Sequence, residues 1–414
     1  MQKYSTHYDV IVVGGGASGL MAAGTSASQG KRVLILEKNR ELGKKLKITG
    51  GGRCNITNAE YDVRKLLPHY KQAEKFLYSP FSQFGVEDTF KFFEGRGLPL
   101  VVESKKRAFP ETQRAYDVYK VLEKYIRSQN VSVLKEQSVI KVKTKEGKVI
   151  AVVTKDTEYT ADSFIFATGG ASHPETGSTG DGFKWLNIMG HTTKNPTPNI
   201  VPLEVEDEWV KRLSGATLSF MKISFLADGK RQFSKTGKIL FTHFGLSGPL
   251  ILNSSSEVKE LLDWGDVTAE IDAYPDTEFP DLEKRILKIL DDNKNRDFKN
   301  VYKEIAPEGF SEGTLVKLGF ETDKKCHSVT VEDRKKIVHF LKAMPIKIIG
   351  LMGHNRAVVS DGGITLEEVD MKTMRSTLFS NLYFTGDLLN INRPSGGYSL
   401  QLCWTTGYVA GMNA

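Results

Sequence analysis

Two apolar stretches on either side of a helix-like segment open the chain. Residues 8–14 read YDVIVVG, an almost wholly apolar run with the length of a buried parallel strand, and residues 32–36 form a second such run. Between them, residues 17–29 are rich in Ala, Ser and Gly with apolar side chains at helical spacing, and Gly30 is a typical helix end. Strand, helix and strand within about 30 residues predict a βαβ unit.

Shorter segments of both kinds follow. Residues 115–128 predict an amphipathic helix, and residues 131–134, 138–144 and 149–154 predict short strands. Residues 163–167 predict another buried strand, which runs directly into a Thr-Gly-Gly turn. Buried strands that alternate with helices are typical of the α/β class.

The composition changes near residue 195. Residues 195–202 contain three prolines and suit a linker, residues 203–273 alternate short β-like runs with turns, and residues 282–340 are more helical and highly charged. From Pro345 the sequence returns to strand-like and glycine-rich character. This order predicts a region inserted between two parts of one α/β domain.

Length and composition are those of an ordinary globular protein. A chain of 414 residues suits two or three domains, and 40% hydrophobic residues allow a sizeable core. Cys54, Cys326 and Cys403 lie far apart, which argues against a disulfide framework, a metal site or a dithiol and fits a reducing cytoplasm. No run of eighteen apolar residues occurs, so we expect no membrane span, and we expect the apolar start to be strand and helix rather than a signal sequence.

The net charge of +7 is unevenly distributed. Residues 1–130 carry +9, whereas residues 198–345 carry −3. A solvated surface accounts for such an excess, because charge informs about partners and not about fold. The alternative is attraction to an anionic partner, either a dinucleotide or a nucleic acid.

The predicted βαβ unit carries the motif Gly14-x-Gly16-x-x-Gly19, with Glu37 at the end of its second strand. The three glycines permit a tight turn, close approach of a pyrophosphate, and close packing of helix on strand. The helix N-terminus then offers free N–H groups to phosphate, and Glu37 can accept hydrogen bonds from a ribose diol. Strand, helix and acid at the right distances make dinucleotide binding the prediction.

A basic, glycine-rich run follows at residues 44–55, KKLKITGGGRCN. Its three successive glycines expose backbone N–H groups, and its cations suit phosphate or the electron-rich edge of a flavin. A flexible basic loop is the alternative. Cys54 is read as a small buried contact residue, with a redox thiol or a flavin attachment point as alternatives.

Four later segments extend the predicted dinucleotide site, and the last two favour FAD. Residues 166–170 run from a strand into a glycine turn, and residues 177–182 form a second glycine-rich segment. Neither is specific alone, but after the first fingerprint both support a dinucleotide site. Residues 382–387 end a strand on Asp387, which can accept from a ribityl chain, and Gly396-Gly397-Tyr398 opens a helix. That second helix N-terminus can stabilise negative charge on a reduced flavin, a device that NAD does not need.

These stretches resemble the BaiN/RdsA (aminoacetone oxidase-like) family, among the glutathione reductase-type flavoproteins with two dinucleotide-binding domains. The matching stretches are YDVIVVGGGASGL, GKKLKITGGGRCNITN, FATGGASHPETGSTGDGF, ILFTHFGLSGPLIL and LYFTGDLLNINRPSGGYSLQLCWTTG, which reach from one end of the chain to the other. The triple-glycine and FTHFGLSGP stretches are the most specific. One departure is residues 388–394, where the family pattern has acidic residues and more glycine, and this leaves the substrate open.

The resemblance implies a discontinuous Rossmann-like FAD-binding domain at 1–197 and 346–414, an inserted β-barrel-like domain at 198–274 and an inserted helical region at 275–345. It implies that the adenosine part of FAD lies near the first fingerprint, Glu37 and Val139, and the ring near the triple glycine, Asp387 and the last glycine pair. The predicted FAD contacts are Gly14, Gly16, Ala17, Ser18, Gly19, Glu37, Lys38, Lys44, Thr49, Gly50, Gly51, Gly52, Arg53, Cys54, Asn55, Val139, Ala167, Thr168, Gly169, Gly386, Asp387, Gly396, Gly397 and Tyr398.

Catalytic candidates are few. His243 could transfer a proton beside a hydride transfer, although a loop-fixing role is favoured for it. Arg53 and Arg393 could bind a carbonyl or phosphate, and a surface or structural role suits them equally well. Ser247, before Gly248-Pro249, is predicted to cap a helix. No second GxGxxG follows a strand, so a nicotinamide would dock directly on the flavin or the substrate would supply the electrons.

Three functions remain in competition. The first is an FAD-dependent oxidoreductase acting on a small organic molecule, for which the resemblance implies amine oxidation or reduction of a conjugated double bond, with NAD(P)H as a candidate donor. The second, which the resemblance also implies, is reduction of uridine to dihydrouridine in ribosomal RNA. The basic N-terminal part favours it, although no RNA-binding module is visible. The third is a flavin-binding regulatory protein without turnover. The oligomeric state is left open.

Overall fold

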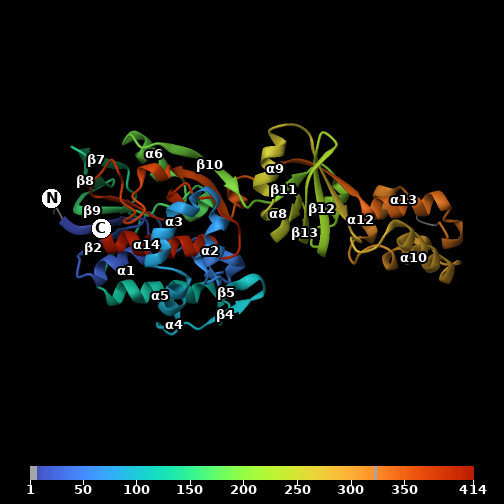
Figure 1. The fold of residues 1–414 in the computed structure, drawn as a ribbon, viewed down its shortest axis with the longest axis horizontal. Helices are drawn as coiled ribbons and strands as arrows, with labels where there is room; N and C mark the ends of the chain where they lie inside the picture. The colour runs from blue at the N-terminus through green and yellow to red at the C-terminus, as the bar shows by residue number, and fades with distance from the viewer. Residues whose placement is uncertain (1–6, 321–323) are drawn as a thin grey trace. The chain divides into compact units, whose positions relative to one another are not determined.

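The computed structural model describes residues 7–320 and 324–414, and Figure 1 shows their arrangement. The chain divides into two units, Met1–Pro198 with Ala357–Ala414, and Asn199–Arg356. Each unit has its own hydrophobic core. No helix of the described residues is both long and apolar enough to cross a membrane.

The first unit is built on a mostly parallel sheet. Its strands follow the order β6 (Ser132–Leu134), β2 (Val33–Leu36), β1 (His7–Val13), β9 (Glu158–Phe166), β8 (Lys148–Val153) and β7 (Lys141–Lys145), and β18 (Leu382–Phe384) pairs with β9. Strand β1 runs parallel to β2 and β9, whereas β8 runs antiparallel to β7 and β9. All of β2 and the last four residues of β1 are buried, as expected of strands covered on both faces. The predicted βαβ unit is confirmed.

Helices from both ends of the sequence pack beside this sheet. α1 (Ala17–Ser28) lies against α14 (Tyr398–Asn413) and α5 (Ala115–Ser128). A glycine of α14 makes the close contact with α1 possible, because a Cβ at Gly407 would lie 2.5 Å from the carbonyl oxygen of Ser18. The other elements of this unit are α2 (Val63–Leu66), α3 (Glu74–Gln83), α4 (Val86–Glu94), α6 (Asp181–Ile188), β3 (Thr57–Asn58), β4 (Leu100–Glu103) and β5 (Arg107–Pro110).

The proline-rich segment predicted as a linker is a strand. β10 (Thr193–Asn199) pairs with β17 (Val359–Ile364) in a two-stranded sheet of the described residues. Pro196 and Pro198 fit there because each strand of such a pair has one open edge, where a missing N–H costs no ladder hydrogen bond.

A buried histidine connects the segment after α6 to the segment after β17. His191 Nδ1 lies 2.6 Å from Glu368 Oε2, and His191 Nε2 lies 3.1 Å from Ser376 Oγ. Ser376 Oγ already accepts from the N–H groups of Leu378 and Phe379, so its hydroxyl donates to Nε2. This leaves Nδ1–H to donate to Glu368, and His191 is held neutral.

We expect acid to destabilise the fold through this pair. Burial lowers the pKa of His191, and the neighbouring Glu368 offsets part of this effect. Burial raises the pKa of Glu368, but hydrogen bonds from His191 and Thr192 outweigh it, so the pKa of Glu368 is also lowered. Both folded pKa values lie below the unfolded ones, so the unfolded chain binds more protons and stability falls as pH decreases, first below about pH 6.5 for the imidazole. Urea unfolding across this range should give a steeper pH dependence for the natural chain than for His191→Gln; equal slopes would contradict the assignment.

The second unit is a closed barrel with helices. Its strand order is β11 (Leu203–Val205), β14 (Gly245–Ser247), β13 (Lys230–Thr242), β12 (Thr217–Ala227), β15 (Val267–Asp272) and β16 (Met344–Leu351), and β11 pairs with β16 to close it. Its helices include α7 (Glu208–Arg212), α8 (Pro249–Leu252), α9 (Ser255–Leu262), α10 (Phe279–Asp292), α11 (Phe298–Val301), α12 (Ser311–Leu318) and α13 (Val331–Lys342).

Barrel and helices share one core, which changes two expectations. Ile271 of β15, Ile286 of α10 and Leu341 of α13 belong to the same buried cluster, so residues 198–274 and 275–345 do not form separate cores. Strand β16 buries alternate residues against this core, so the boundary expected at 346 falls inside a barrel strand and the units divide after residue 356. Ser247 was predicted to cap a helix, but it ends β14. Gly248 takes the cap position of α8 instead.

Candidate functional site

A cleft lies in the first unit where β1, β2 and β9 end. Residues that follow these strands line it, together with the first turns of α1 and α14. It encloses about 1220 Å³ of empty space, its open mouth included. The carboxyl ends of parallel strands are where α/β sheets usually bind ligands.

The N-terminus of α1 faces this cleft without a cap of its own. Gly16 occupies the cap position, no side chain accepts from the first turn, and the first turn holds no acidic residue. A Cβ placed on Gly16 would meet no atom within 4 Å, whereas one on Gly19 would lie 2.0 Å from the carbonyl oxygen of Gly14. Gly19 therefore serves packing, and Gly16 leaves open space at an N-terminus suited to an anion.

Glu37 is held at one side of the cleft by backbone and side-chain amides. Its Oε2 accepts from Gly15 N at 2.7 Å, and its Oε1 accepts from the backbone N and Nδ2 of Asn39, each at 2.8 Å. A carboxylate offers about four acceptor positions, so one position on Oε2 is left for a ribose hydroxyl. The structure adds Asn39, which the sequence did not single out.

Three lysines gather at the cleft and bind the loop that follows β9. Lys38 Nζ donates to Asp181 Oδ2 at 2.8 Å, and Lys44 Nζ donates to the carbonyl oxygen of Glu175 at 2.7 Å. Lys45 Nζ lies 3.2 Å from Ser172 Oγ. The glycine-rich segment after β9 thus becomes part of the cleft wall.

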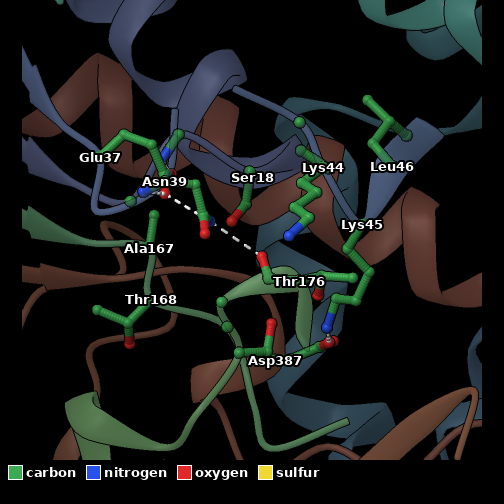
Figure 2. A pocket seen from close by; sticks show the side chains of 18 of the residues that line it. Ser18, Glu37, Asn39, Lys44, Lys45, Leu46, Ala167, Thr168, Thr176 and Asp387 are labelled. Atoms are coloured by element: carbon green, nitrogen blue, oxygen red, sulfur yellow. Dashed lines mark hydrogen bonds and ion pairs between the residues drawn. The ribbon is translucent and has the colours of Figure 1, made fainter. Parts of the chain in front are cut away.

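Asp387 provides a charged acceptor in the opposite wall. Its Oδ2 lies 3.3 Å from Lys45 Nζ, and its Oδ1 accepts from the guanidinium of Arg393. Burial raises the pKa of this carboxyl, but Arg393 and Lys45 outweigh that effect and hold the pKa below its ordinary value. Figure 2 shows Lys45 reaching toward Asp387. An ionised Asp387 can accept hydrogen bonds from a polyhydroxyl chain.

Arg393 is not placed to contact a substrate. Its side chain is fully buried, and it also donates to the carbonyl oxygen of Ile391 at 2.6 Å and to Ser399 Oγ at 3.1 Å. The guanidinium therefore fixes Asp387 beside the first turn of α14 instead of binding a carbonyl or phosphate.

The triple glycine is open but does not line the cleft. Gly50, Gly51 and Gly52 have φ of 58°, 66° and 88°, and a Cβ on Gly51 or Gly52 would meet no atom within 4 Å. Asn55, with its amide turned to satisfy its neighbours, accepts from Gly397 N at 3.0 Å. The structure thus brings this loop to the glycine pair that opens α14.

Arg53 and Cys54 are both engaged by the protein. Arg53 pairs with Glu103, donates to Gln113 Oε1 at 2.7 Å, and its guanidinium lies 4.2 Å above the ring of Phe109. Cys54 is fully buried, which raises the pKa of its thiol to about 12 although a bond with Thr49 works the other way. A neutral buried thiol is poorly reactive, which favours the buried contact role predicted for Cys54 over the redox alternative.

The cleft includes about half of the predicted FAD contacts. Those that line it are Gly14, Gly16, Ala17, Ser18, Glu37, Lys38, Lys44, Thr49, Val139, Ala167, Thr168, Gly169 and Asp387. Those that do not are Gly19, Gly50, Gly51, Gly52, Arg53, Cys54, Asn55, Gly386, Gly396, Gly397 and Tyr398. Polar lining residues that sequence reasoning missed are Asn39, Gln137, Ser138, Thr176 and Ser399, whereas Lys45, Ser178 and Asp181 belong to segments that it singled out without naming them as contacts.

His243 belongs to the second unit and not to the lining of the cleft. It lies exposed in the turn between β13 and β14, and its ring meets that of Phe244 edge-on at 4.9 Å. Its role as a proton donor stays a prediction.

The residues of the cleft fit FAD. The open N-terminus of α1 suits a pyrophosphate, Glu37 suits a ribose, and Asp387 suits the ribityl chain. Thr168 also lines the cleft, although its Oγ1 is buried against Gly182 of α6, where an added Cβ would lie 2.2 Å from it.

Comparison with known proteins agrees with this geometry. The profile of the HI0933-like protein Rossmann domain family matches residues 8–413. The chain is similar to a 3-dehydro-bile acid delta(4,6)-reductase of Clostridium scindens, with 29% identity over 97% of this chain and 98% of that protein. It is also similar to a ribosomal RNA dihydrouridine synthase of Haemophilus influenzae, with 26% identity over 100% of this chain and 99% of that protein. The fold is similar to that of a flavocytochrome c3 fumarate reductase, with a TM-score of 0.51 and 14% identity over 99% of this chain and 78% of the other.

Proposed function

Because the chain belongs to the HI0933-like Rossmann family of FAD-dependent oxidoreductases, we propose that it reduces a carbon–carbon double bond conjugated to a carbonyl group. The observation that carries the proposal is the cleft, in which an uncapped helix N-terminus, Glu37 and an ionised Asp387 offer FAD one continuous set of contacts. Amine oxidation has less support, since one relative is named a reductase, the other a dihydrouridine synthase, and neither name describes an oxidase.

The residues divide the binding of FAD among them. The first turn of α1 binds the pyrophosphate, and Glu37 accepts from the adenosine ribose. Asp387, kept ionised by Lys45 and Arg393, accepts from the ribityl hydroxyls. Bound FAD supplies the hydride for the reaction. NAD(P)H is the proposed electron donor and docks on the flavin, since the sequence shows one dinucleotide fingerprint.

An anaerobic two-step assay tests this proposal. NADH or NADPH should bleach the yellow holoenzyme, and a 3-oxo-4-ene steroid acid should restore the colour while its own double bond gains two hydrogen atoms. Bleaching by an amine, with none by NAD(P)H, would favour oxidation of amines. A holoenzyme that neither reagent reduces would contradict the proposal and favour a protein without turnover.

Ribosomal RNA is the second candidate substrate. The charge of +9 on residues 1–130 favours a polyanion, and a relative of similar identity acts on ribosomal RNA by its name. The same reduced holoenzyme, mixed with ribosomal RNA transcribed in vitro, should then form dihydrouridine detectable by mass spectrometry of nucleosides. Unchanged uridine would remove this candidate and leave the small molecule.

A further inference from the structure

A short turn of the first unit carries two lysines in a strained backbone. Residues Ser104–Arg107, here the 104–107 turn, connect β4 to β5. Lys105 and Lys106 have φ of 60° and 56°, in the left-handed region that glycine adopts freely and long side chains rarely do. Backbone strain of this kind clusters at binding sites and catalytic sites.

Two cations of this turn lack a carboxylate. The exposed ammonium of Lys105 makes no hydrogen bond or ion pair within the described ranges. Arg107 Nε and Nη2 donate to Ser104, to its carbonyl oxygen at 3.1 Å and to its Oγ at 3.2 Å, and the guanidinium lies 5.8 Å from the ring centroid of Phe109. Lys106, by contrast, pairs with Glu60. The local charge is therefore not balanced by the protein itself.

The 104–107 turn is fixed beside the glycine pair that opens α14. Asn58 Nδ2 donates to the carbonyl oxygen of Lys105 and to that of Gly396, each at 3.2 Å. Ser399, in the first turn of α14, lines the cleft. On the other side, the pair between Arg53 and Glu103 ties β4 to the triple-glycine loop. The turn thus adjoins both glycine segments that were predicted to meet the flavin ring.

We propose that Lys105 and Arg107 bind an oxyanion of the substrate, a carboxylate or a phosphate, next to its reacting double bond. This inference rests on the proposed function, because it names the class of substrate for that site. Neither cation pairs with a carboxylate in the described ranges, and Asn58 ties the turn to Gly396 just before α14, so both can form charge-assisted hydrogen bonds to such a group. The side chain of Lys105 is exposed, and its left-handed backbone carries a cost that glycine at this position would avoid.

Paired probes test the proposal by binding alone, without turnover. The holoenzyme is titrated with cinnamate against methyl cinnamate, and with uridine 5′-monophosphate against uridine, and binding is followed through the flavin absorbance. Each pair differs in its oxyanion. The charged member should bind roughly tenfold more tightly in one or both pairs, and the pair that responds identifies carboxylate or phosphate as the source.

Variants separate the charge of Lys105 from the shape of the turn. Lys105→Gly should remove most of the preference while unfolding at the same or a higher temperature, since glycine relieves the strain. Lys105→Arg should keep the preference, and Arg107→Ala should weaken it. Lys148→Ala is the matched control, because Lys148 is an exposed lysine at the start of β8, on the opposite side of this unit from β4 and β5 (Figure 1).

The outcomes separate this inference from the proposed function. A holoenzyme that binds charged and neutral members equally, or a Lys105→Gly variant that keeps the full preference, would overturn the inference. Neither result would contradict the proposed reduction of a double bond, because the anaerobic assay tests that reaction separately. Failure of the anaerobic assay with the preference intact would instead contradict the proposed function alone.

Discussion

Gly16→Val is expected to give a folded but colourless protein. The backbone of Gly16 is extended, with φ of −82° and ψ of −169°, and no atom lies within 4 Å of a Cβ placed there. A valine side chain therefore meets nothing in the FAD-free chain. It occupies the space in front of the first turn of α1, where the pyrophosphate must approach. We expect FAD binding to weaken by roughly 100-fold, since overpacking of a close contact costs about 1–3 kcal/mol.

Variants of two further glycines serve as comparisons for Gly16→Val. Gly353→Val is the matched control, because Gly353 also has open space around its Cβ and an ordinary φ but lies in the second unit. It should stay yellow. Gly19→Ala should lose stability with or without FAD, since its Cβ would lie 2.0 Å from the carbonyl oxygen of Gly14. Flavin absorbance per protein and thermal unfolding distinguish the three; a yellow Gly16→Val protein would contradict the assignment of the cleft.

The sequence predicted those parts of the fold and site that depend on local signals. The apolar runs of β1 and β2 and the glycines of the first turn act within a few residues of one another, so their spacing predicts the βαβ unit. Glu37 was found for the same reason, since it ends β2. The Rossmann-like domain with an inserted barrel is confirmed by the structure and by the family match.

Contacts between distant segments could not be read from the sequence. Lys45, Asp387 and Ser172 come from three parts of the chain, and the parallel sheet alone brings them together. Arg393 shows the same difficulty, because an arginine before a glycine pair is equally consistent with a substrate ligand and with a buried partner of Asp387. Burial decides between them, and burial is a property of the fold.

The end of the insert was missed for a related reason. β16 has the alternating apolar pattern of a half-buried strand, which suits either unit. Its pairing with β15 and β11 assigns it to the barrel. The proline-rich segment was misread because β10 pairs on one side only and therefore tolerates prolines that a central strand would exclude.

The second large effect concerns the buried charges beside the cleft. Arg393→Met is expected to lower the free energy of unfolding by about 3–5 kcal/mol, the usual cost of removing one partner of a buried ion pair. The guanidinium is fully buried and serves Asp387, Ile391 and Ser399, so methionine fills much of its volume but leaves these acceptors unsatisfied. Lys45→Met should cost about 1 kcal/mol or less, because Lys45 lies 3.3 Å from Asp387 and its side chain is 25% exposed.

Rescue by a second substitution tests whether charge is the cause. In Arg393→Met the carboxylate of Asp387 keeps only Lys45 as a counter-charge, so its pKa should rise from the lowered value of the natural chain. Adding Asp387→Asn removes the uncompensated charge, and the double variant should therefore be more stable than Arg393→Met alone. Urea unfolding of the FAD-free proteins at neutral pH measures both effects. If the two substitutions lower stability additively, Arg393 stabilises the fold by packing and not by its pairing with Asp387.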